Sequence, residues 1–136
     1  MKSLTKKEFE HECHKLQFRG KCSVLFHKKT SQNLNKVSLF YKNDTLLNSE
    51  LLEIIINKYT SAVLINFEIS LEFPFYKIEN IMHQLLAYIP NNLDLVITAT
   101  YIDTKNIQEA DITVISSKQS KFNLFLSKIF KQNIVI

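Results

Sequence analysis

Apolar residues form short runs or alternate with polar residues in four segments, and these segments predict the strands of a sheet. Residues 61–70 contain a continuous apolar run, as expected of a strand covered on both faces. Residues 93–102 and 110–115 alternate between apolar and polar positions, and 22–26 is a shorter apolar run. Because only a polar connection at 103–108 separates the last two strands, we expect them to form an antiparallel hairpin with a loop longer than the tightest type.

Three other segments carry apolar residues at helical spacing. Residues 5–18 begin with a capping box and end at a glycine, and residues 75–89 follow a proline and keep their helical spacing over four turns. Residues 50–56 form a short helical piece. Residues 37–47 are ambiguous, because their apolar positions suit a helix whereas their Ser, Asn, Asp and Thr residues are poor helix formers. The polar run 27–35 indicates a loop.

The order of these elements predicts the fold class. Along the chain they run helix, strand, helical segment, strand, helix, strand, strand. Two successive strand–helix–strand units predict right-handed crossovers and parallel pairing, and the last hairpin adds antiparallel pairing. We therefore expect an α/β (α+β) fold in which a four-stranded mixed sheet is packed with two to three helices.

The residues after 117 form a distinct C-terminal tail, 118–136. After a polar linker, its apolar residues recur at helical spacing among lysines; they are Phe122, Phe125, Leu126, Ile129 and Phe130. A basic amphipathic helix of this kind suits a partner's groove or, weakly, an anionic membrane surface. The same pattern equally suits a helix folded back over the sheet, and the last residues suit a strand added at a sheet edge.

Composition and charge narrow the class of protein. The 136 residues make one domain the default, and 46% apolar with 22% charged residues is an ordinary globular balance. No run of about 18 apolar residues is present to span a membrane. Two cysteines do not make a disulfide framework, which favours the cytoplasm. The net charge of +4 comes from scattered lysines, so we expect no nucleic-acid partner.

The residues that usually carry catalysis form no legible set. The single glycine, Gly20, cannot build a phosphate-binding loop, which needs several glycines. No Ser/His/Asp or Cys/His pattern is visible. A zinc site would combine His11 and His14 with Cys22 or His27, but solvated histidines beside a buried cysteine are the simpler interpretation. We therefore expect no enzyme, no cofactor and no metal.

Five segments resemble, in order and spacing, parts of the C-terminal domain of FtsZ, the bacterial relative of tubulin. Arg19-Gly-Lys-Cys-Ser-Val-Leu-Phe26 resembles that family's Gly-Lys-Ala-Leu-Met-Gly strand, and Asn48-Ser-Glu-Leu-Leu-Glu53 resembles its Ser-Pro-Leu-Leu-Glu helix end. Ala62-Val-Leu-Ile-Asn-Phe67 resembles its Gly-Val-Leu-Val-Asn-Ile strand. Leu93-Asp-Leu-Val-Ile-Thr-Ala-Thr-Tyr-Ile-Asp103 resembles Ala-Asn-Ile-Ile-Phe-Gly-Ala-Val-Ile-Asp, and Asp111-Ile-Thr-Val-Ile-Ser116 resembles Val-Arg-Val-Thr-Val-Ile-Ala. The resemblance implies a domain over residues 1–117.

The resemblance implies a protein that touches a filament without hydrolysing nucleotide. The family's GTPase half is absent, and its Asn-x-Asp-x-x-Asp loop falls on Lys6, Glu8 and His11, which break the pattern. We therefore expect a non-catalytic regulator of cell division or a related filament system that binds or caps FtsZ-type polymers. The expected contact residues are Lys6, Lys7, Glu8, His11, Leu71, Phe73 and Phe75, with the apolar residues of the tail reserved for a second partner.

A second hypothesis needs no filament. The chain is then a small α/β adaptor that docks a partner or a membrane through its amphipathic tail, and the lysine-rich N-terminal end is simply a solvated surface.

Overall fold

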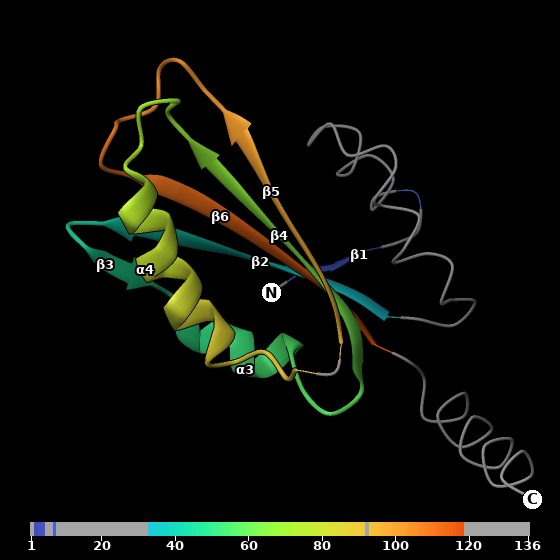
Figure 1. Cartoon of the computed structure of the whole chain (residues 1–136). Coiled ribbons are helices and arrows are strands. Elements are labelled where there is room, and N and C mark those ends of the chain that lie inside the picture. The colour runs from blue at the N-terminus through green and yellow to red at the C-terminus, as the bar shows by residue number, and fades with distance from the viewer. Residues whose placement is uncertain (1, 5–6, 8–32, 92, 119–136) are drawn as a thin grey trace, which may run out of the picture.

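The computed structural model describes residues 2–4, 7, 33–91 and 93–118 (Figure 1). The strands are β1 Lys2–Leu4, β2 Asn33–Lys42, β3 Thr45–Leu47, β4 Thr60–Ile69, β5 Asp94–Tyr101 and β6 Ala110–Lys118. The helices are a 3-10 turn, η1 Ser49–Leu51, and two α-helices, α3 Leu52–Ile55 and α4 Phe75–Leu86. A mixed sheet packed with two α-helices confirms the α/β (α+β) class and the helices expected near 50–56 and 75–89.

The sheet has more strands than the sequence predicts, and they lie in a different order. Its main path is β1-β2-β6-β4-β5, and the short β3 pairs with β2, so five strands form the path where four were expected. β4 and β5 are parallel, as expected of two strands joined through a helix, whereas the other pairs are antiparallel. The predicted hairpin between β5 and β6 is wrong, because β6 inserts between β2 and β4.

The ambiguous segment 37–47 is a β-hairpin. Asn43 and Asp44 both have positive φ, at 52° and 60°, which is the geometry of a two-residue type I′ turn. Asparagine and aspartate tolerate this left-handed region better than most residues, which explains their presence between two apolar runs. The preceding strand β2 begins at Asn33, inside the segment expected to be a loop.

Three predicted elements lie largely or wholly outside the described residues. The helix at 5–18 is described only at Lys7, which is exposed, and the strand at 22–26 is not described. Residues 119–136 of the tail are likewise outside this part of the chain. The polar linker expected before the tail's helical pattern begins partly as a strand, because β6 continues through Ser116 and Ser117 to Lys118. Ser116 and Ser117 are both buried.

The core lies between the helices and one face of the sheet. Paired positions show which side chains share this face, because residues directly opposite each other in a sheet point the same way. Val37, Val114 and Ile65 form one such row across β2, β6 and β4, and all three are buried. Ile81 and Leu85, one turn apart on α4, pack in the same apolar cluster. Figure 1 shows α3 and α4 on the same side of the sheet.

Candidate functional site

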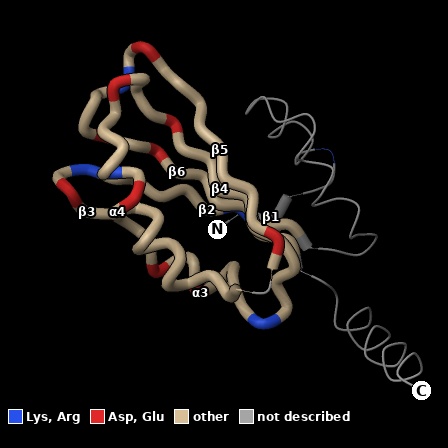
Figure 2. Tube along the Cα trace, viewed as in Figure 1, with Lys and Arg blue, Asp and Glu red and all other residues tan. Residues whose placement is uncertain are grey.

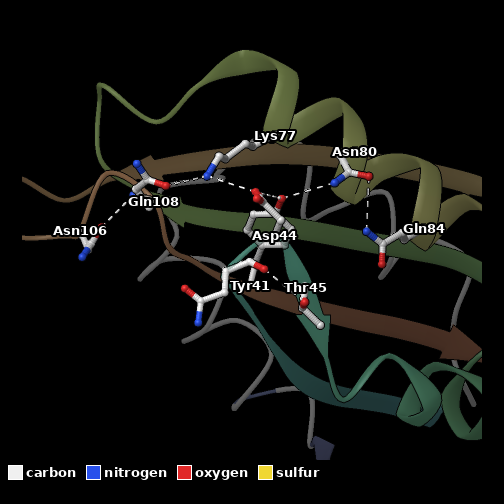
Figure 3. A network of polar contacts seen from close by, with 9 residues as sticks. Tyr41, Asp44, Thr45, Lys77, Asn80, Gln84, Asn106 and Gln108 are labelled. Carbon is white, nitrogen blue, oxygen red and sulfur yellow. Dashed lines mark hydrogen bonds and ion pairs between the residues drawn. The ribbon is translucent and has the colours of Figure 1, made fainter.

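A buried lysine organises the most extensive polar cluster that the described residues form (Figure 3). Lys77 lies on the buried stripe of α4, one turn before Ile81, and its side chain is only 4% exposed. Its Nζ lies 3.3 Å from Asp44 Oδ1 and donates a hydrogen bond to Gln108 Oε1 at 2.9 Å. The ammonium therefore joins α4 to the β2–β3 turn and to the loop that precedes β6.

The cluster continues through Tyr41. The Tyr41 hydroxyl donates to Asp44 Oδ1 at 3.3 Å and accepts from Asn80 Nδ2 at 3.3 Å, while Gln84 Nε2 donates to Asn80 Oδ1 at 3.5 Å. A buried, hydrogen-bonded lysine that is also paired with a carboxylate holds the elements that it joins in one relative position. We call Lys77, Asp44, Gln108, Tyr41 and Asn80 the latch, because their contacts fix three segments relative to one another. These residues include no nucleophile paired with a base.

The sequence analysis missed this latch. One signal was present, because Lys77 occupies the same face of the helical pattern as Ile81 and Leu85, at spacings of four. A lysine on an apolar stripe indicates a buried cation in need of partners. Its partners could not be identified in the same way, since Asp44 and Gln108 lie 33 and 31 residues away along the chain.

A second polar group lies on the sheet face opposite the helices. Asn66 is fully buried in β4, and its Oδ1 accepts hydrogen bonds from the hydroxyls of Thr98 at 3.0 Å and Thr100 at 3.4 Å. Its Nδ2 has no hydrogen-bond partner among the described residues. Threonine hydroxyls that donate to an amide are not activated as nucleophiles, so this arrangement supports no reaction.

The end of β4 presents an exposed apolar surface, which we call the end surface and define by Leu71, Phe75 and Tyr76. Their exposed fractions are 73%, 71% and 67%. The connection turns sharply here, because Phe73 N–H donates to Ser70 O at 3.0 Å and Pro74 precedes the first turn of α4. The turn directs Phe73 inward and leaves its neighbours in water.

The residues expected to contact a partner are thus divided by the structure. Leu71 and Phe75 are on the end surface, whereas Phe73 is only 6% exposed and packs edge-on against Tyr41, with ring centres 6.2 Å apart. Phe73 is therefore a core residue and is not available to a partner. Lys7 is exposed. The other expected contacts lie outside the described residues: Lys6, Glu8, His11, Phe122, Phe125, Leu126, Ile129 and Phe130.

No described residues gather into a possible metal site of three or more His, Cys, Asp or Glu side chains. The histidines and cysteines of the zinc hypothesis lie outside this part of the chain. Within the described ranges, no helix has both the length and the apolar character needed to cross a bilayer.

Four of the five segments that resemble FtsZ fall on described elements. Residues 48–53 contain η1 and the start of α3, and 62–67 lie within β4. Residues 93–103 contain β5, and 111–116 lie within β6. The fifth segment, 19–26, lies outside the described residues, and the described strands that precede α3 are β1, β2 and β3.

Comparisons with known proteins assign no family to the chain. No family model matches it, and no curated protein matches its sequence. Among solved structures, thiamine monophosphate kinase (ThiL) from Aquifex aeolicus is similar at a TM-score of 0.44 and 12% identity, over 87% of this chain and 45% of that one. A chain of the HypE–HypF complex is similar at a TM-score of 0.40 and 10% identity, over 65% and 34%. The chain thus spans less than half the length of either structure, and we draw no function from them.

Proposed function

We propose that this chain is a non-catalytic protein-interaction domain that contacts its partner through the end surface. The observation that carries this proposal is the exposure of Leu71, Phe75 and Tyr76, three large side chains close together in the sequence at the end of one strand. Apolar area in water costs about 25 cal/mol per Å², and a group of exposed apolar side chains marks an interaction site. Aromatic residues are also enriched at interfaces.

The proposed partner is an FtsZ-type polymer in the cytoplasm. This choice rests on the resemblance of five segments to the FtsZ C-terminal domain, which implies a contact with the next subunit's nucleotide-bearing face through the loop at 71–75. These 136 residues contain no glycine-rich phosphate-binding loop, so we expect them on their own to add to the end of a filament and block further growth. Without the acidic catalytic loop, it would leave the nucleotide intact.

The latch supports a binding role for the end surface. Lys77 follows Phe75 and Tyr76 directly on α4, and its bonds to Asp44 and Gln108 fix the first turn of that helix. A contact surface that is already held in one conformation loses less entropy on binding. The backbone that carries Phe75 and Tyr76 is therefore already fixed in the unbound protein.

Cosedimentation tests the proposal. The purified chain is added to FtsZ polymerised with GTP, and we expect less pelleted polymer and lower GTP turnover as the chain occupies filament ends. A variant with Phe75→Ser and Tyr76→Ser should lose both effects. Leu86→Ser is the matched control, because Leu86 is exposed on the same helix but lies at its other end.

The proposal fails if the chain changes neither sedimentation nor GTP turnover. It also fails if the control variant loses the effect as fully as the aromatic variant, since the end surface would then not be the contact. An effect that survives in the aromatic variant and disappears when residues 119–136 are removed would place the contact in the tail, which also contradicts the proposal.

A further inference from the structure

The strand β5 carries an apolar face that the helices do not cover. Its residues Leu95, Ile97, Ala99 and Tyr101 are exposed, and they alternate with less exposed residues along the strand. Leu95 pairs with Val63 and Ile97 pairs with Ile65, so this set shares the sheet face on which α3 and α4 pack. We call these four residues the β5 face.

The position of β5 in the sheet explains the exposure. β5 is the last strand of the path and has β4 as its only neighbour in the described sheet. The buried residues of α3 and α4 share one apolar cluster with the core-facing residues of β2, β6 and β4. The β5 face is therefore an apolar strip at an open sheet edge, and such edges are normally protected by another segment.

The surroundings of the β5 face are acidic. Three exposed acidic side chains lie on segments next to β5: Glu72 in the connection after β4, Glu79 on α4 and Asp103 in the loop after β5. Lys77 is buried and paired with Asp44, so it adds little positive potential at this edge. In the loop that follows β5, Figure 2 shows one acidic and one basic position next to each other. The basic residue of this loop, Lys105, is paired with Asp111. A segment that covers this face is expected to be apolar on one side and basic on the other.

The chain itself supplies a segment with that chemistry. Residues 119–136 contain three lysines, Lys121, Lys128 and Lys131, and no acidic residue. Their apolar residues recur at helical spacing, which predicts one apolar stripe flanked by lysines. The charges are thus opposite to those around the β5 face.

The attachment point of this segment lies within reach. Lys118, the last residue of β6, pairs with Thr60 at the end of the sheet where β5 also begins, since Ala62 pairs with Asp94. β6 is two strands from β5, a separation of about 10 Å, and the β5 face is about 20 Å long. About three extended residues span the first distance. A helix over residues 121–131 would be about 16 Å long, close to the length of the face.

We propose that residues 119–136 fold back as an amphipathic helix and cover the β5 face of the same molecule. Leu95, Ile97 and Tyr101 receive the apolar stripe, and the lysines lie toward the surrounding carboxylates. The contact shields the open edge of the sheet. This inference does not depend on the proposed filament partner, because it concerns only the chain's own surfaces.

A single tryptophan reports on this contact. The chain contains no tryptophan, so the variant Phe125→Trp places one fluorophore on the stripe of the tail. In the full-length protein we expect its emission to be blue-shifted and poorly quenched by acrylamide. Adding Ile97→Lys should shift the emission to the red and restore quenching to the level of the isolated tail peptide.

Leu47→Lys is the matched control. Leu47 and Ile97 are both 44% exposed, and Leu47 lies in β3, beside β2 and away from β5. This control should leave the emission of the introduced tryptophan unchanged. Circular dichroism is used to check that both lysine variants remain folded. Lys128→Glu is a second test, which changes the tail and leaves the sheet intact. It should weaken the contact between the tail and the β5 face, most strongly at low salt.

Three results would overturn the proposal. One is a tryptophan emission in the full-length protein that already matches the emission of the isolated peptide. Another is an equal response to Ile97→Lys and Leu47→Lys, which would place the tail elsewhere. The third is a blue shift that disappears on dilution, which would mean that a second copy supplies the helix.

Discussion

Removing either member of the Lys77–Asp44 pair leaves a different charge behind, and this asymmetry gives a sharp prediction. The lysine side chain is 4% exposed, whereas the aspartate side chain is 73% exposed. Asp44→Asn leaves a buried ammonium facing neutral acceptors. Lys77→Met leaves a carboxylate that water already solvates. We therefore expect Asp44→Asn to destabilise the fold more than Lys77→Met.

The magnitude follows from the separation of 3.3 Å between Lys77 Nζ and Asp44 Oδ1. Coulomb's law gives about 1 kcal/mol at this distance in water and about 5 kcal/mol at an effective dielectric constant of 20. Exposed pairs contribute about 0.2–1 kcal/mol, and breaking a fully buried pair costs about 3–5 kcal/mol. For a pair exposed at one end, we expect Asp44→Asn to lower the free energy of unfolding by about 1–2 kcal/mol. The melting temperature falls by about 4 °C for each kcal/mol.

Lys77→Met should stay within about 1 kcal/mol of the wild type, because the methionine fills the apolar part of the site and no desolvated charge remains. The double variant should resemble Lys77→Met, since no buried ammonium remains for the carboxylate to neutralise and the asparagine oxygen can still accept from the Tyr41 hydroxyl. Asparagine tolerates the positive φ of 60° at position 44, so Asp44→Asn tests the charge with the turn preserved.

Urea unfolding of the four proteins measures these differences as a double-mutant cycle. Because the double variant should resemble Lys77→Met, the expected coupling free energy has the size of the Asp44→Asn effect, about 1–2 kcal/mol. If Lys77→Met proved more destabilising than Asp44→Asn, the reasoning would be refuted, because the lysine would then contribute more through its contacts than its burial costs.

Three further predictions concern the core, the β2–β3 turn and the Tyr41 hydroxyl. Phe73→Ala should lower the free energy of unfolding by about 3–5 kcal/mol, whereas Phe75→Ala should change it by less than about 0.5 kcal/mol, because only Phe73 is in the core; similar urea midpoints for the two would contradict this placement. Asn43→Ala should cost about 1–2 kcal/mol in the same assay, since alanine is strained at a φ of 52°, and Asn43→Gly should be close to neutral. Tyr41→Phe removes a buried hydroxyl that both donates and accepts, and should lower the melting temperature by an amount equivalent to about 1 kcal/mol; an unchanged melting temperature would show that these bonds add no net stability.

Local patterns predicted the elements that are set by local interactions. The unit β4–α4–β5 was correct in type and close in its bounds, because a continuous apolar strand and a helix with four turns of apolar spacing are strong signals. Its parallel pairing followed from the geometry of the connection. The same reasoning failed at 37–47, because over so short a segment the apolar positions suit both the helical period and the strand period. The decisive feature there is the left-handed turn at Asn43 and Asp44.

The candidate surfaces were only partly predictable for a related reason. The sequence analysis assigned Leu71, Phe73 and Phe75 to one surface, and the structure separates Phe73 from the other two. The sharp turn at Ser70 decides which of these side chains faces the core, and its hydrogen bond to Phe73 depends on where β4 ends. Exposure in a short connection is therefore a tertiary property that apolar spacing does not predict.

The strand order that the sequence failed to predict is also what produces the β5 face. In the expected arrangement, β5 and β6 are neighbours, and β5 has a strand on each side. In the structure, β6 pairs with β2 and β4 instead, so β5 is left at the edge of the described sheet. Nothing local in β6 distinguishes these choices, because its alternating apolar residues satisfy either pairing. The choice depends on burial: between β2 and β4, Ile112 and Val114 are fully covered by the helices. Placing β6 in the middle completes the core and, by the same step, leaves an apolar strand at the edge of the described sheet, which is the surface that we propose the tail covers.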